Sequence, residues 1–344
     1  MHMRSHQRSL IIGAVIAVLI MSACGANSNS TGTGKTHLLL MVGGMNKQIY
    51  LPNMLTKQLG YFDQEGLDVT LIDEASGQSA EDLLVAGQVD AGSGAYNHTI
   101  ELQAAGQPVE CVVQLDIAPG EAEMISTKEA GKIHSIADLK GKNLGVTELG
   151  SGTQTLTQAL LHRAGIASNQ VNFVSVGADD TFISALQQGR IDAGMTTEPT
   201  ISRIVSSGAG QVLVDLRTPQ KTEAALGGPF PFICVFMLND YVSVHHTVVQ
   251  KLVNAYVKTL KWIQTHTPEE IAAKMPTDYY GGNEALYVTA LRNQLTMFSP
   301  DGKMPANGPG AVLGIEQQTD PAVWGKSIDL TLTYTNDFVD AAGD

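Results

Sequence analysis

Two stretches of the chain share one pattern of apolar and polar positions, with an offset of 102 residues. Residues 69–94 read VTLIDEASGQSAEDLLVAGQVDAGSG, and residues 171–196 read VNFVSVGADDTFISALQQGRIDAGMT. They align without a gap, and the identities in register are Leu84/Leu186, Gly87/Gly189 and Asp90-Ala91-Gly92/Asp192-Ala193-Gly194. Any two α/β units resemble each other to some degree, but matches at these positions favour an internal structural repeat.

Each copy of the repeat predicts a strand, a helix and a second strand. The apolar runs at 69–72 and 171–176 predict buried strands. A polar turn follows, with Ser79 and Thr181 as the predicted helix N-caps, and the helices end at Gly87 and Gly189, where a positive φ is commonly needed. The next strands begin at Val89 and Ile191. A β-α-β unit implies parallel pairing through a right-handed crossover, so we expect two α/β lobes with mainly parallel sheets flanked by helices.

The strand ends of these lobes indicate where a ligand would bind. In parallel α/β sheets, ligands bind beyond the carboxyl ends of the strands. In the first lobe this rule selects the loops 43–50, 74–78, 93–98 and 115–116. In the second lobe it selects 149–153, 177–180 and 196–199. We therefore expect a ligand cleft between the lobes.

One of these loops begins a helix with a polar N-terminus. GVTELGSGTQTLTQALL (145–161) predicts a strand end, a Gly/Ser/Thr turn and a helix, whose first N–H groups and dipole favour anionic groups. Ser151 and Gly152 stand where a phosphate loop needs Lys and Ser/Thr. Thr155 stands at the third glycine of the dinucleotide pattern. Both nucleotide motifs fail, which leaves a generic polar cradle.

The N-terminus predicts export. Residues 1–23 carry Arg4 and Arg8, an apolar run at 10–21 and small residues before Cys24, as in a secretory signal peptide. The twelve apolar residues fall short of the roughly 20 that span a bilayer. The same segment looks like a lipobox, in which Cys24 is lipidated. Ordinary cleavage to a free product is the alternative. Residues 24–36 have almost no apolar content and predict a flexible tether.

Charge and cysteine content exclude several partners. The formal net charge is −13, and the chain has no basic block, so nucleic acid is not an expected partner. Cys111 and Cys234 lie in apolar, strand-like runs, which favours two buried thiols over a disulfide and leaves their pairing open. No metal-type Cys/His spacing occurs, since the adjacent His245 and His246 point apart. We expect no metal and no cofactor.

Five segments carry a family resemblance. They are LPNMLTKQLGYFDQEGLDV (51–69), LLVAGQVDAGSG (83–94), SIADLKGKNLGV (135–146), LGSGT (149–153) and TTEPT (196–200). With the lipoprotein signal, they resemble the solute-binding proteins of ABC importers, in the branch for sulfonates, taurine, nitrate and thiamine pyrimidine precursors. The resemblance implies a type II periplasmic-binding-protein fold, with two lobes joined by two crossing strands. We expect residues 37–118 and 241–344 in the first lobe and 119–240 in the second.

The resemblance and the loop positions together select the candidate ligand-binding residues. Ser151, Gly152 and Thr153 match the family position that often holds an oxyanion or polar head group. Asp90 and Asp192 recur at helix-to-strand turns, where a structural role is favoured over acid–base work. His98 ranks below the candidates, because a histidine satisfied within its loop is the commoner case. The candidates are Asn46, Lys47, Gln48, Ser76, Gly77, Ser93, Gly94, Tyr96, Asn97, Asp116, Ser151, Gly152, Thr153, Thr197 and Glu198.

These features predict a monomeric, lipid-anchored binding protein outside the cytoplasm, in the periplasm or on the cell surface. It would deliver a sulfonate-like or heteroaromatic organic solute to an ABC permease and ATPase. No Ser/His/Asp or Cys/His constellation is recognisable, so we expect the protein not to be an enzyme. One alternative is an enzyme on the same scaffold. The resemblance includes a relative that makes the thiamine pyrimidine from its own residues with a pyridoxal cofactor, but that relative is cytosolic and has a Cys-rich motif. A ligand-sensing module for a receptor is the other alternative.

Overall fold

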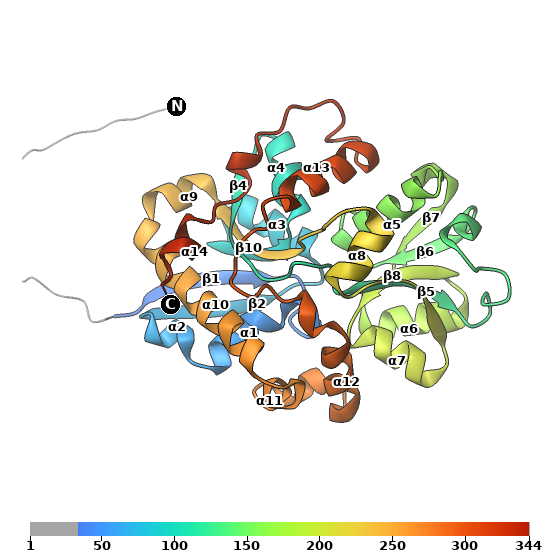
Figure 1. Ribbon diagram of the computed structural model, residues 1–344, viewed down its shortest axis with the longest axis horizontal. Helices are drawn as coiled ribbons and strands as arrows, with labels where there is room; N and C mark the ends of the chain where they lie inside the picture. The colour runs from blue at the N-terminus through green and yellow to red at the C-terminus, as the bar shows by residue number, and fades with distance from the viewer. Residues whose placement is uncertain (1–33, 344) are drawn as a thin grey trace, which may run out of the picture. The chain divides into compact units, whose positions relative to one another are not determined.

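Two five-stranded sheets organise the protein, as the computed structural model in Figure 1 shows for residues 34–343. The first sheet has the strand order β2-β1-β3-β10-β4, and the second has the order β7-β6-β8-β5-β9. We call each sheet with its flanking helices the first and the second lobe. Both lobes belong to one unit, Lys35–Asp344. The predicted signal peptide, the lipidation site Cys24 and nearly all of the tether lie outside the described residues.

Each sheet is mixed, with two parallel pairs followed by two antiparallel pairs in the same order, so the sheets are less parallel than predicted. β1 pairs in parallel with β2 and β3, and β6 pairs in parallel with β7 and β8. β10 runs antiparallel to β3 and β4, as β5 does to β8 and β9. The first sheet contains β1 Thr36–Val42, β2 Leu67–Asp73, β3 Ala91–Ala95, β4 Val109–Gln114 and β10 Ile233–Leu238; the second contains β5 Glu121–Ser126, β6 Asn143–Val146, β7 Asn172–Ser175, β8 Ala193–Thr197 and β9 Gly210–Leu216.

Helices pack on both faces of each sheet (Figure 1). The first lobe carries α1 Leu51–Gln58, α2 Tyr61–Gln64, α3 Gly77–Val85 and α4 Asn97–Ala104; the second carries α5 Gly152–Arg163, α6 Asp179–Gln188, α7 Thr200–Ser207 and α8 Pro219–Leu226. The C-terminal part adds α9 Asn239–Val244, α10 His246–Thr265, α11 Pro268–Ala272, α12 Glu284–Gln294, α13 Gly308–Thr319 and α14 Asp337–Ala341. Short 3₁₀ helices cover η1 Gln48–Tyr50, η2 Ile136–Leu139, η3 Ser168–Gln170, η4 Thr277–Tyr280, η5 Leu295–Met297 and η6 Leu330–Leu332.

The internal repeat forms β2-α3-β3 in the first lobe and β7-α6-β8 in the second. Gly87 and Gly189 both have a positive φ at the helix end, as predicted. The predicted N-caps are wrong. Ser76 caps α3, because its hydroxyl accepts a hydrogen bond from the N–H of Ser79, and α6 begins at Asp179 before Thr181. The two strands of each repeat are parallel but not adjacent, since β1 or β6 lies between them.

Asp90 and Asp192 have equivalent structural roles in the two lobes. The Asp90 carboxylate accepts a hydrogen bond from the N–H of Leu39 at 2.8 Å. The Asp192 carboxylate accepts one from the N–H of Asn143, also at 2.8 Å. Each carboxylate therefore ties the start of a repeat strand to the neighbouring central strand, β1 or β6, which agrees with the structural role expected for it.

Two crossing segments connect the sheets. Residues 115–120 lead from β4 to β5, and residues 227–232 lead from α8 to β10. They run side by side, because the N–H of Asp116 donates to the carbonyl of Ile233 and the N–H of Phe232 donates to the carbonyl of Asp116. The predicted boundary at residue 240 is therefore too late, since β10 pairs with β3 and β4 in the first sheet.

The long helix α10 closes the first lobe. Its apolar side chains recur at helical spacing and pack against α1 and α2. The hydroxyl of Tyr256 donates to Asn53 at 2.7 Å, and Thr259 pairs with Thr56 at 2.7 Å. Thr267 and Glu270 form a capping box at the start of α11.

Candidate functional site

A cavity lies between the lobes at the carboxyl ends of β1, β3, β6 and β8. Its free space is about 320 Å³ when the part open to solvent is included, and in this closed arrangement only about 20 Å³ is accessible to a water-sized sphere. Residues from both lobes and from the second crossing form its wall, at the strand ends that the loop positions predict. The lining residues are Lys47, Ile49, Tyr50, Ser76, Gly77, Ala95, His98, Glu121, Thr147, Ser151, Gly152, Thr153, Thr197 and Phe232.

The N-terminus of α5 forms the second-lobe wall. Gly152 and Thr153 are its first two residues. Their N–H groups have no intrahelical acceptor, because no helical carbonyl lies four residues before them. The hydroxyls bond to one another, with 2.7 Å between those of Ser151 and Thr153 and 3.0 Å from the Thr147 hydroxyl to each. The Ser151 hydroxyl also donates to the carbonyl of Glu148 at 2.6 Å. The side chains therefore hold the turn, and the backbone N–H groups remain for a ligand.

His98 on α4 forms the opposite wall and is fully buried. Its Nδ1 lies 3.0 Å from a carboxylate oxygen of Glu81 and 3.1 Å from one of Glu101. Burial lowers the pKa of His98, but these two carboxylates outweigh it and hold the pKa well above the usual range. The raised pKa favours the protonated imidazole, in which both ring nitrogens donate. Its Nε2 lies in the cavity wall and has no hydrogen-bond partner among the described residues.

Lys47 and Glu121 bring a base and an acid to the same cavity. Both are nearly inaccessible to solvent. The Lys47 ammonium donates to the carbonyls of Gly43 at 2.7 Å and Ala75 at 2.8 Å, and burial lowers its pKa. Burial raises the pKa of Glu121 well above the usual range, although Lys47 opposes this. One oxygen of Glu121 has no partner among the described residues, so the carboxyl can hydrogen-bond to a ligand.

Polar contacts hold the lobes together around the cavity. Asn46 donates to Asp179 at 2.5 Å, and the N–H of Gln48 donates to the carbonyl of Glu198 at 3.0 Å. On the other side, the hydroxyls of Ser76 and Ser79 donate to the Glu148 carboxylate. Each of these contacts joins one lobe to the other. The structure therefore shows the two lobes closed over the cavity.

Gly152 lies at a close approach between the two lobes. A Cβ atom at this position would lie 2.6 Å from Cζ of Phe232 and 3.2 Å from Cβ of Ala95. Ala95 belongs to β3 of the first lobe, and Phe232 belongs to a crossing segment. A side chain at residue 152 would therefore collide with the opposite wall.

The structure brings about half of the sequence-predicted site residues into the cavity wall. These are Lys47, Ser76, Gly77, Ser151, Gly152, Thr153 and Thr197. The remaining candidates lie outside the wall, namely Asn46, Gln48, Ser93, Gly94, Tyr96, Asn97, Asp116 and Glu198.

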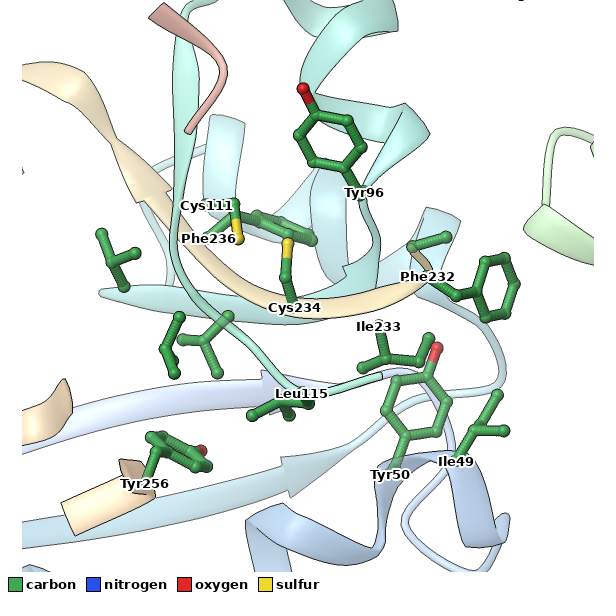
Figure 2. Close-up of a cluster of buried hydrophobic side chains, with 14 of the residues drawn as sticks. Ile49, Tyr50, Tyr96, Cys111, Leu115, Phe232, Ile233, Cys234, Phe236 and Tyr256 are labelled. Carbon is green, nitrogen blue, oxygen red and sulfur yellow. The ribbon is translucent and has the colours of Figure 1, made fainter. Parts of the chain in front are cut away.

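Tyr96 shows why a candidate in the right loop does not reach the cavity. Figure 2 shows its ring directed away from Ile49, Tyr50 and Phe232, which line the cavity. Its hydroxyl pairs with that of Thr333 at 2.6 Å, so the ring belongs to the first-lobe core.

Other candidates hold the framework. Asn97 donates to Glu101 at 2.7 Å, Ser93 accepts from Asn53 at 3.1 Å, and Gly94 packs on the Phe236 ring. Gln48 bonds to Gln294 and to the carbonyl of Tyr287.

Two acidic candidates are also buried away from the cavity. The Glu198 carboxylate accepts hydrogen bonds from Ser202 and forms an ion pair with Arg217 at 2.7 Å. Asp116 is fully buried in a crossing segment, where burial raises its pKa well above the usual range.

Sequence reasoning missed seven lining residues. They are Ile49, Tyr50, Ala95, His98, Glu121, Thr147 and Phe232. His98 lies within a selected loop and was ranked too low, whereas Glu121 could have been found as an acid in the apolar strand EAEMIS. No sequence pattern identifies Phe232 as a lining residue, because its position in the cavity wall depends on the path of the second crossing segment.

Cys111 and Cys234 are buried, free thiols on the neighbouring strands β4 and β10 (Figure 2).

Within residues 34–343, no helix has the length and apolar content needed to cross a membrane.

Comparisons with known proteins identify a family. Residues 49–271 match the family described as NMT1/THI5 like. A protein of known structure from Bordetella bronchiseptica RB50 is 34% identical, with a TM-score of 0.84 over 90% of this chain and 97% of that chain. The alkanesulfonate-binding protein SsuA from Xanthomonas axonopodis pv. citri, solved with bound MOPS, is 17% identical. Its TM-score is 0.66, over 90% of this chain and 98% of that chain. The last likeness shows the type II periplasmic-binding-protein fold.

The curated relatives carry a different kind of name. The 4-amino-5-hydroxymethyl-2-methylpyrimidine phosphate synthase of Legionella pneumophila is 26% identical over 161 residues, which are 47% of this chain and 49% of that protein. The chain thus spans about half the length of the curated relatives it matches. The expectation that the protein is not an enzyme is contradicted by these relatives, which are named as enzymes. A catalytic site need not contain a Ser/His/Asp or Cys/His constellation.

Proposed function

Since the chain belongs to the NMT1/THI5-like family, we propose that it captures a small organic solute in the cavity between its lobes. In this proposal it is the extracytoplasmic binding component of an ABC importer. The solute contacts both lobes, and these contacts favour the closed arrangement over an open one.

The buried His98, whose Nδ1 lies beside two carboxylates, is the observation that carries the proposal. Its Nε2 faces the cavity without a partner among the described residues, opposite the free N–H groups at the start of α5. Both features donate hydrogen bonds, and the imidazolium adds a positive charge. An anionic or strongly polar acceptor group fits between them. Hydrogen bonds to charged groups typically contribute about 1.5–3 kcal/mol each.

The rest of the wall favours an organic solute over a bare inorganic ion. Phe232, Ile49 and the Tyr50 ring supply apolar surface, and Glu121 supplies a carboxyl group. An inorganic anion would use the donors and leave this surface without a function. A sulfonate-like or heteroaromatic solute uses both.

Calorimetric titration of the protein, freed of solute by unfolding and refolding, tests the proposal. Taurine, an alkanesulfonate, nitrate and an aminopyrimidine represent the four candidate classes. We expect saturation at about one molecule per chain for one organic class. His98→Gln should weaken binding at least tenfold, given ~1.4 kcal/mol per tenfold change, whereas the exposed control His134→Gln should not. Equal affinity in both variants would contradict the role of His98, and no binding by any class would contradict the solute assignment.

The predicted location is part of the same proposal. Lipidation of Cys24 would anchor the chain beside the permease. One acyl chain binds membranes only marginally, so stable anchoring needs further acylation, at about 0.8 kcal/mol per buried CH₂. Labelled palmitate should enter the wild-type chain and not Cys24→Ala; equal labelling would disprove the anchor.

The curated relatives favour a second candidate function, the formation of a pyrimidine phosphate. The cavity holds Lys47, His98 and Glu121, three groups with shifted pKa values, as active sites often do. Mass spectrometry of small molecules released by the purified protein tests this candidate. Appearance of 4-amino-5-hydroxymethyl-2-methylpyrimidine phosphate in wild type and its loss in His98→Gln would support it.

A further inference from the structure

Three carboxylates meet outside the cavity, where α4 and α13 pack together. Figure 1 shows these two helices side by side. Glu101 lies on α4, Glu316 lies on α13, and Asp320 follows the end of α13. One carboxylate oxygen from each residue lies within 4.8 Å of the others.

Glu316 distinguishes this group from an ordinary acidic patch. Its relative exposure is 0%, and neither carboxylate oxygen has a hydrogen-bond partner among residues 34–343. A buried polar group without a partner is costly, and a buried charge is normally paired or bound to a metal. The side chain nevertheless points at two further carboxylates, the least favourable neighbours for an anion.

The surroundings offset little of the charge of this group. Burial raises the pKa of Glu316 well above its usual range, Glu101 and Asp320 raise it further, and His98 opposes them only in part. His98 lies beside Glu101, but the same imidazole also contacts Glu81. The Lys326 ammonium donates to the carbonyl of Ala104 at 2.6 Å.

A second cavity gives solvent access to Glu101 and Asp320. Its free space is about 540 Å³ when the part open to solvent is included, and its lining also contains Gly150, Gln154 and Gln158. An ion that enters here can keep water ligands. The cavity also borders both lobes, since α5 belongs to the second.

We propose that Glu101, Glu316 and Asp320 bind a hard divalent cation, with Ca²⁺ as the representative ion, between α4 and α13. The donor atoms are all carboxylate oxygens, which suit hard cations such as Ca²⁺ rather than the softer metals that favour His and Cys. Ca²⁺ takes six to eight oxygen ligands, so three carboxylates and several waters complete its shell. The cation would replace the proton of the Glu316 carboxyl group and give its two oxygens, which lack hydrogen-bond partners among the described residues, a ligand role.

Calorimetric titration with CaCl₂ tests the proposal on the full chain, after chelator treatment and removal of the chelator. We expect one Ca²⁺ per chain, with a dissociation constant on the order of 10⁻⁴ M, as in extracellular calcium modules. Glu316→Gln keeps the shape of the side chain and should weaken binding at least tenfold. Asp320→Asn keeps the oxygen that accepts from the N–H of Ala322 and should also weaken it.

Control variants separate binding at these three carboxylates from binding elsewhere on the chain. Glu223→Gln changes an exposed glutamate of α8 and should bind Ca²⁺ as wild type does. No saturable binding of Ca²⁺, Mg²⁺ or Mn²⁺ by the wild type would overturn the proposal, as would equal affinities of Glu316→Gln and Glu223→Gln. Binding of Zn²⁺ alone that is lost in His98→Gln and kept in Glu316→Gln would also overturn it, in favour of the Glu81, His98 and Glu101 group.

Discussion

At the residue scale, the charge of a single histidine depends on neighbours from two helices. Glu101 stands three positions after His98 on α4, so this contact could have been predicted once the helix start was known. Glu81 comes from α3, and its contact with His98 exists only in the folded lobe. The sequence could therefore select the loop, but the pKa of His98 and the direction of its Nε2 required the tertiary structure.

Glu123 allows a test of whether burial keeps the carboxyl groups of β5 protonated in the folded protein. It lies fully buried on β5, where burial raises its pKa to about 8, although Thr157 donates to it at 2.9 Å. The folded protein thus keeps a proton that the unfolded chain releases near pH 4.5. The contribution of Glu123 to stability is complete below about pH 4.5 and is lost as the pH rises towards 8, at about 1.4 kcal/mol per pH unit.

Glu123→Gln should remove this dependence. Relative to wild type, the free energy of unfolding of the variant should increase steadily from pH 5 to pH 8 in urea denaturation. The exposed Glu223→Gln should follow the wild-type profile. A constant difference between Glu123→Gln and wild type over this range would show that Glu123 does not hold a proton.

At the scale of elements, the internal repeat was the most reliable signal in the sequence. Apolar runs predicted β2 and β7, and Gly87 and Gly189 marked the helix ends, because backbone conformation there depends on local chemistry. The N-caps were misplaced, since both Ser76 and Ser79 suit a helix start and only the packed turn decides between them. Strand neighbours were also not predictable from the repeat, because β1 and β6 come from outside it.

Substitution of Asp90 and Asp192 tests whether equivalent residues of the two repeat copies contribute equally to stability. Asp90→Ala and Asp192→Ala each leave one backbone N–H, of Leu39 or Asn143, without its acceptor. We expect each variant to lose about 1–3 kcal/mol of unfolding free energy in urea denaturation, with little change in solute affinity. Asp68→Ala, at an exposed position of β2, is the matched control. Weaker solute binding with unchanged stability would instead indicate a functional aspartate.

At the scale of the whole molecule, the sequence predicted two lobes and a cavity at their strand ends. It did not predict the path of the second crossing, because β10 reads as an apolar strand that either sheet could accept. Phe232 was therefore missed, although it forms the wall opposite Gly152. Tyr96 was misplaced for a related reason, since only packing decides which side of a loop an aromatic ring enters.

Native mass spectrometry of the purified chain tests the capture of one solute between closed lobes most directly. Gly152→Ala places a methyl group against Phe232 and Ala95 and should prevent closure, whereas Gly310→Ala adds one on α13 where nothing lies within 4 Å. We predict one small molecule per chain, bound to wild type and Gly310→Ala and absent from Gly152→Ala. No bound molecule in the wild type, or equal retention by all three proteins, would contradict the account.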